Sequence, residues 1–247
     1  MADNVSLPQI RSNNLLASLP DDVLASMVPH FTVQTLKQGA VLYEAGDEVE
    51  HVYFPQSGMI SLLAVMQNGK AIETATIGRE GVAGAMAGIG LYKSMVRAVV
   101  QLPMVTTRIS AARFRQFAAQ SKPVENICIR YNEVLLTQAR LTAACNALHP
   151  VDARFCRWLL QSADRAEAPT LPLTQELLAE MLGVRRTSVT EVAGRLQKEG
   201  LISFSRGIIR ILDRPALEAM TCECYQSLID QAATLGSPAL TPANSAA

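Results

Sequence analysis

The pattern of hydrophobic and polar positions changes its period along the chain. From Phe31 to Ile109, apolar residues alternate with polar ones in short runs separated by turns that contain glycine, which is typical of β-strands. Asn68-Gly69, between two of these runs, is a strong hairpin signal. Many short strands at even spacing predict a small antiparallel barrel or jelly roll in this part of the chain.

A long helix is predicted between Pro123 and Leu148, where apolar residues recur alternately four and three positions apart. This heptad spacing is typical of two helices packed side by side, so it predicts a dimer seam. The seam consists of Ile127, Tyr131, Val134, Gln138, Leu141 and Cys145. We expect polar Gln138 to fix its register. The alternative is that this stripe packs on the barrel of its own chain, although a second stripe that begins at Cys128 can take that role.

The stretch from Leu173 to Leu212 predicts two helices and then two short strands. Apolar positions give each helix one buried face, and Gly183 between them can take the left-handed conformation of a tight turn. Thr174 is placed to cap the first helix. The two strands turn at Arg206-Gly207. This order is that of a winged helix-turn-helix.

The outward face of the second of these helices carries side chains that can read DNA bases. An arginine fork matches the two acceptors of guanine, threonine can bond a base or pack on the thymine methyl, and glutamate can accept from cytosine. The predicted base contacts are Arg186, Thr187, Thr190 and Glu191. Arg206, in the turn of the wing, is available to phosphates. The alternative is an ordinary helical hairpin with a solvated charged face.

Composition limits the classes of protein that fit this order of elements. The chain has 247 residues, enough for one large or two ordinary domains, and its 49% hydrophobic content supports a real core. Lys+Arg and Asp+Glu both number 22, so only a local basic face could bind DNA. There is no apolar run of transmembrane length and no signal-peptide layout. With five scattered cysteines, which fit reduced thiols, we expect a cytoplasmic protein without membrane association.

Metal, cofactor and catalytic chemistry are weakly supported by the sequence. Cys222-Glu223-Cys224 could contribute to a metal site, but two cysteines with no histidine nearby in the sequence form an incomplete set. His30, His51 and His149 are isolated, which disfavours haem. No nucleophile is found with its base. We therefore expect no metal, no cofactor and no enzyme activity.

The order of barrel, long helix and winged helix-turn-helix resembles the cyclic-AMP receptor/FNR (CRP/FNR) family of bacterial transcription regulators. The likeness covers nearly the whole chain and is carried by residues 39–47, 52–54 and 58–62 in the barrel and 175–177, 182–184 and 186–189 in the second half. It implies an α+β fold with an N-terminal antiparallel β-roll like a cyclic-nucleotide-binding jelly roll at 13–121. A dimerisation helix at 122–149 and a winged helix-turn-helix at 150–220 follow, and the tail at 237–247 is predicted to be disordered.

The resemblance also implies partners. It implies a homodimer on near-palindromic double-stranded DNA, with half-sites about one helical turn apart, a spacing described for this family itself, and RNA polymerase as a further partner. Carried over by position, Thr174, Gln175 and Ser188 would join Arg206 on phosphates. Glu191 stands where many members have arginine, so we expect a different consensus site.

The sensing half departs from family members that bind cyclic nucleotides. Those members carry Gly-Glu for the ribose and then Arg-Ser or Arg-Thr for the phosphate. Here Arg79, Glu80 and Gly81 are followed by Lys93 and Ser94, and lysine cannot make the bidentate fork of arginine. We expect a different, unidentified small-molecule effector in this pocket, or none. The alternative function is a regulatory module that acts through protein partners, as cyclic-nucleotide barrels do in kinases and channels; the winged helix-turn-helix argues against it.

Overall fold

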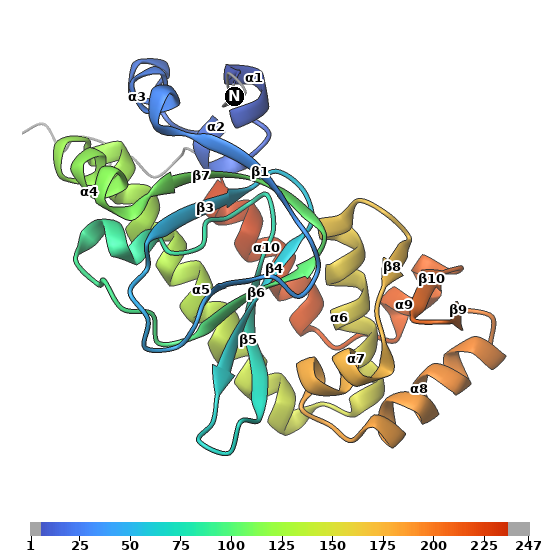
Figure 1. Ribbon diagram of the computed structural model, residues 1–247. Helices are drawn as coiled ribbons and strands as arrows, with labels where there is room; N and C mark the ends of the chain where they lie inside the picture. The colour runs from blue at the N-terminus through green and yellow to red at the C-terminus, as the bar shows by residue number, and fades with distance from the viewer. Residues whose placement is uncertain (1–5, 237–247) are drawn as a thin grey trace, which may run out of the picture.

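The computed structural model describes residues 6–236, and the predicted disordered tail at 237–247 lies outside them (Figure 1). The chain begins with three short helices, α1 (Leu7–Ile10), α2 (Asn14–Ala17) and α3 (Asp21–Met27), followed by the 3-10 turn η1 (Val28–His30). Buried Asn13 caps α2 and donates to the carbonyl oxygens of Pro55 and Gly81, both at 2.9 Å. These hydrogen bonds fasten the N-terminal segment to the body of the protein.

Two antiparallel sheets form the β-roll, with strand orders β1-β7-β3 and β2-β6-β4-β5. The predicted hairpin at Asn68-Gly69 joins β4 to β5, and Gly69 has the positive φ of 80° that such turns need. The η2 turn (Ala85–Ile89) and α4 (Ala111–Gln120) complete this half of the chain. The strands are β1 (Thr32–Leu36), β2 (Val41–Tyr43), β3 (His51–Pro55), β4 (Met59–Val65), β5 (Ala71–Ile77), β6 (Arg97–Leu102) and β7 (Met104–Ser110).

The long helix α5 (Lys122–Leu148) crosses behind the roll in Figure 1 and ends before Pro150. Its buried side packs on β5, η2 and α4. That side contains the predicted dimer seam: Ile127, Tyr131, Val134, Gln138 and Cys145 are buried within the chain, and Leu141 is half-buried.

Most of the predicted seam is thus covered by the same chain. Gln138, which was expected to fix the register between two copies, accepts a hydrogen bond at its Oε1 from the backbone N–H of Thr76 on β5 at 3.1 Å. A heptad spacing defines an apolar stripe but does not say which neighbour covers it. The apolar stripe that remains exposed on α5 contains Ile129, Leu136 and Ala143, which follow one another at intervals of seven residues.

The second half is a winged helix-turn-helix with a final helix that folds back. The sheet order is β8-β10-β9. The last helix, α10, packs on α5 and α6 (Figure 1). The elements are α6 (Val151–Ala166), β8 (Thr170–Pro172), α7 (Gln175–Leu182), α8 (Arg186–Lys198), β9 (Ile202–Ser205), β10 (Ile208–Ile211), α9 (Arg214–Ala219) and α10 (Cys224–Gly236). The α+β fold class predicted from the sequence is confirmed. Among residues 6–236, every helix is too short or too polar to cross a bilayer.

The two halves share packed surface. Met59, Leu63 and Leu102 of the roll belong to the same apolar core as the helices of the second half. At this junction the carboxylate of Glu73 on β5 is buried and accepts hydrogen bonds from Ser61 Oγ at 2.5 Å and from Trp158 Nε1 of α6 at 2.7 Å. Burial raises the pKa of Glu73 to about 7, even though both hydrogen bonds favour its charged form.

Candidate nucleic-acid interface

The helix-turn-helix contains the cap, the glycine turn and the packed apolar faces that the sequence predicted. Thr174 Oγ1 caps α7 by accepting from the N–H of Leu177 at 3.2 Å, and Gly183 ends the helix in the left-handed region with φ of 63°. The buried faces of α7 and α8 pack together through Leu178 and Val189, both fully buried. This packing turns the opposite face of α8 toward solvent.

The four residues predicted to contact bases all lie on the exposed face of α8. Arg186, Thr187, Thr190 and Glu191 are exposed there in the first two turns. Thr190 Oγ1 donates to Gln175 Oε1 at 2.9 Å, which ties this face to the start of α7. The arrangement presents one basic, one acidic and two hydroxyl side chains together.

Glu176 was not expected at this face. Its Oε1 lies 2.7 Å from Nη1 of Arg186, and the two side chains are 60% and 63% exposed. An ion pair this exposed contributes only about 0–1 kcal/mol, so DNA could displace it readily. The sequence offered one sign of the pair, because a glutamate in the first turn of α7 precedes the arginine that opens α8.

The residues predicted to contact phosphates lie around the same face. Thr174 and Arg206 are exposed, while Gln175 and Ser188 are half-buried. Arg206 and Gly207 have φ of 50° and 74°, as a two-residue type I′ turn between β9 and β10 requires. The turn holds Arg206 at the tip of the wing, beside the helix-turn-helix.

A cavity of about 450 Å³ lies between the roll and α5. Two of the predicted effector residues, Lys93 and Ser94, line it, and Ser94 Oγ already donates to the carbonyl oxygen of Val96 at 2.7 Å. Among the described residues that line the cavity, Lys93 alone is charged. Most of the wall is apolar and includes Met86, Leu91, Met95, Leu135 and Leu136.

The other three predicted effector residues do not line this cavity. Arg79 pairs with Glu167 at 2.6 Å, and Glu80 pairs with Arg165 of α6 at 3.0 Å. Gly81 packs so closely on the ring of Tyr131 that a Cβ would lie 1.8 Å from its hydroxyl oxygen. The structure therefore separates these three residues from Lys93 and Ser94, because Arg79 and Glu80 pair with residues at the end of α6 and Gly81 packs on α5.

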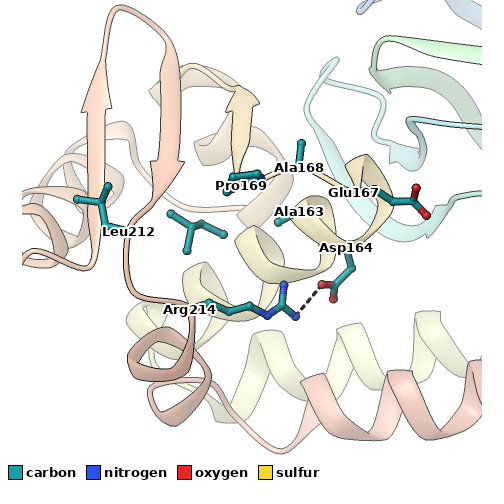
Figure 2. A pocket seen from close by; sticks show the side chains of 8 residues that line it. Ala163, Asp164, Glu167, Ala168, Pro169, Leu212 and Arg214 are labelled. Carbon is teal, nitrogen blue, oxygen red and sulfur yellow. Dashed lines mark ion pairs between the residues drawn. The ribbon is translucent and has the colours of Figure 1, made fainter.

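A second hollow, of about 420 Å³, lies within the winged domain beside α6 (Figure 2). Figure 2 shows Arg214 and Asp164 directed toward each other, and their ion pair measures 2.7 Å. Tyr225 of α10 donates to the same carboxylate at 2.7 Å. These contacts join α9 and α10 to α6, so we assign the hollow a structural origin.

The fold combines a β-roll, a cavity between the roll and α5, and a winged helix-turn-helix whose exposed α8 begins with a basic residue. This combination defines a two-domain DNA-binding regulator. Residues 33–121 match the family model of the cyclic nucleotide-binding domain, and residues 153–220 match that of the Crp-like helix-turn-helix domain. The chain belongs to the CRP/FNR family of transcription regulators. Members of this family are not enzymes, and neither is this chain.

Individual relatives are distant but span most of the chain. The global nitrogen regulator of Nostoc sp. is 22% identical over 188 residues, which cover 72% of this chain and 84% of the relative. A solved CRP/FNR-family regulator from Eubacterium rectale has a TM-score of 0.67 and 20% identity, covering 85% of this chain and 98% of the other. FixK2 from Bradyrhizobium japonicum has a TM-score of 0.66 and 16% identity, covering 78% and 98%. These structural likenesses show a shared fold.

Proposed function

We propose that the protein regulates transcription from the cytoplasm as a homodimer that binds near-palindromic double-stranded DNA. The observation that carries this proposal is the joint exposure of Arg186, Thr187, Thr190 and Glu191 on α8. With α8 in the major groove, Arg186 would bind guanine through two hydrogen bonds and Glu191 would accept from cytosine. Thr174, Gln175, Ser188 and Arg206 surround that face and would hold the DNA backbone.

The exposed side of α5 supports the dimer. Ile129 and Leu136 are 51% and 41% exposed, and Ala143 follows at the same seven-residue interval. A line of apolar side chains along a helix at heptad spacing suits a second copy of the same helix. We therefore place the dimer interface on this stripe, in place of the one predicted from the sequence.

The cavity supports control by a small molecule other than a cyclic nucleotide. Among the described residues that line it there is no arginine to bind a cyclic phosphate bidentately. A mainly apolar wall with Lys93 as its one charged group suits an apolar ligand that carries a single negative charge. Leu136 lines the cavity and also belongs to the proposed interface, so a ligand there would act on the packing of the two α5 helices. A contact with RNA polymerase is part of the same proposal and follows from the family resemblance.

Selection of bound DNA in vitro, starting from a random duplex library and the purified full chain, tests this proposal. We expect an enriched motif with two-fold symmetry and half-sites about one helical turn apart. An enriched motif without symmetry would contradict the dimeric arrangement. Failure to enrich any motif, together with binding that does not depend on salt, would favour a module that acts through protein partners.

A further inference from the structure

Four side chains with metal-binding atoms meet where the end of α5 touches the start of α10. Cys145 lies in the last turn of α5 and His149 directly after that helix, whereas Cys222 precedes α10 and Cys224 is its first residue. Their ligand atoms all lie within 4.8 Å of one another. Within the group, Sγ of Cys145 is 3.6 Å from Sγ of Cys222, and Sγ of Cys224 is 3.7 Å from Nδ1 of His149.

The 3.6 Å and 3.7 Å separations match those between ligand atoms of a tetrahedral metal site. Zinc binds thiolate sulfur at about 2.3 Å and histidine nitrogen at about 2.0–2.1 Å, so tetrahedral ligand atoms lie roughly 3.6–3.8 Å apart. The cysteines are free thiols, and the 3.6 Å between Cys145 and Cys222 is far from the roughly 2.05 Å of a disulfide. The four ligand atoms thus already lie close together, within 4.8 Å of one another.

The histidine is oriented for this role. Nε2 of His149 lies 3.2 Å from the carboxylate of Glu223, which suits a proton on Nε2, while Nδ1 faces Cys224. A metal-bound histidine commonly donates its other N–H to a carboxylate, which fixes the tautomer and leaves a lone pair for the metal.

Charges near the cluster point to an anionic centre. Arg154 and Arg157 on α6 are only 6% and 5% exposed, and each has a buried Nε without a hydrogen-bond partner in the described chain. Neither lies within ion-pair distance of a carboxylate of residues 6–236. Both act electrostatically on Cys145, and Arg157 also acts on the carboxylate of Glu73. Zinc with three thiolates and a neutral histidine carries one net negative charge, which these buried guanidinium groups would stabilise.

We propose that Cys145, His149, Cys222 and Cys224 bind one zinc ion in a closed, structural site that fastens α10 to the end of α5. Four protein ligands leave no open position, which is typical of structural rather than catalytic zinc. The sequence suggested an incomplete set because His149 is far from Cys222 along the chain, but the fold brings them together. The site lies where the chain turns from α5 into α6, beside the DNA-binding domain.

The test is metal analysis of the full chain, loaded with zinc under reducing conditions and freed of excess metal. We expect about one zinc per chain by mass spectrometry, and cobalt in its place should give the strong visible absorption of a tetrahedral site with thiolate-to-cobalt charge transfer. Cys224→Ser should lose most of the metal, whereas Cys224→His should retain it. Cys156→Ser is the matched control, because Cys156 is a buried thiol on α6 outside the cluster and should leave the zinc content unchanged.

The outcomes separate this inference from the proposed function. A wild-type chain with less than about a fifth of an equivalent of zinc, a cobalt spectrum without thiolate charge transfer, or an iron–sulfur spectrum would overturn it. Full zinc content in a folded Cys224→Ser chain would overturn it as well. If that variant does not fold, wild-type stoichiometry and the cobalt spectrum decide. A chain that binds zinc but no DNA would remove the proposed function alone.

Discussion

Arg186 already has a protein partner on the proposed DNA-binding face. Its ion pair with Glu176 and the hydrogen bond from Thr190 to Gln175 link the first two turns of α8 to the start of α7. A bidentate arginine–guanine contact discriminates by about 1–3 kcal/mol, more than the 0–1 kcal/mol of an exposed ion pair. We therefore expect Arg186 to exchange Glu176 for a base at little cost.

Arg186→Ala should weaken binding to the selected DNA site by about 1–3 kcal/mol and relax the preference at one base pair, because guanine loses its two hydrogen bonds. Fluorescence anisotropy with the selected site and its single-base variants measures both effects. Lys198→Ala, an exposed cation at the far end of α8, is the control and should leave the base preference unchanged. Equal weakening on every sequence would reassign Arg186 to a phosphate.

At the scale of elements, α5 has two apolar faces, one buried in its own chain and one exposed. Its buried face packs on the roll through Ile127 and Val134, and its exposed face carries Ile129 and Leu136. Both faces repeat at heptad spacing, so the helix can support its own domain and a second copy together.

Leu136→Glu should raise the dissociation constant of the dimer at least about tenfold, because it buries a charge against its symmetry mate in the interface; a factor of ten corresponds to about 1.4 kcal/mol. Size-exclusion chromatography with light scattering over a range of concentrations measures the change. Gln120→Glu, at the exposed end of α4, adds the same charge outside the stripe and should leave the dimer intact. An unchanged dimer in Leu136→Glu would place the interface elsewhere.

The sequence predicted those elements that are determined by a few adjacent residues. The cap at Thr174, the turn at Gly183 and the wing at Arg206-Gly207 each depend on a few adjacent residues, and the structure contains all three. Long-range placement was not predictable in the same way. Periodicity could not tell which face of α5 is covered by its own chain, and no local pattern links Cys145 to Cys222, which are 77 residues apart.

At the scale of the whole molecule, Glu73 joins the two halves. Its carboxylate accepts hydrogen bonds from Ser61 within the roll and from Trp158 of α6. Burial disfavours the charged form of Glu73, so the folded state is more stable when this carboxyl is protonated.

Stability should therefore fall as pH rises through neutrality. The pKa of Glu73 is raised from 4.5 to about 7, so its contribution is complete below about pH 4.5 and is lost as pH rises through about 7. The full loss is on the order of 3 kcal/mol. Glu73→Gln keeps an oxygen acceptor without the charge and should flatten this dependence.

Urea unfolding at about pH 5 and about pH 8 measures the difference between wild type and Glu73→Gln. Glu48→Gln, an exposed carboxyl in the roll, is the control and should keep the wild-type dependence. Parallel pH profiles for wild type and Glu73→Gln would contradict the assignment.

Met59, Leu63 and Leu102 share a core with the winged half, so fragments that contain only one half of the chain would expose apolar surface. A DNA-binding fragment that begins after α5 would expose the apolar residues that these three side chains cover. The isolated roll would in turn expose Met59, Leu63 and Leu102 to water. Chimaeras that graft this winged domain onto another sensor will keep their solubility only if the donor roll supplies equivalent side chains at those three positions.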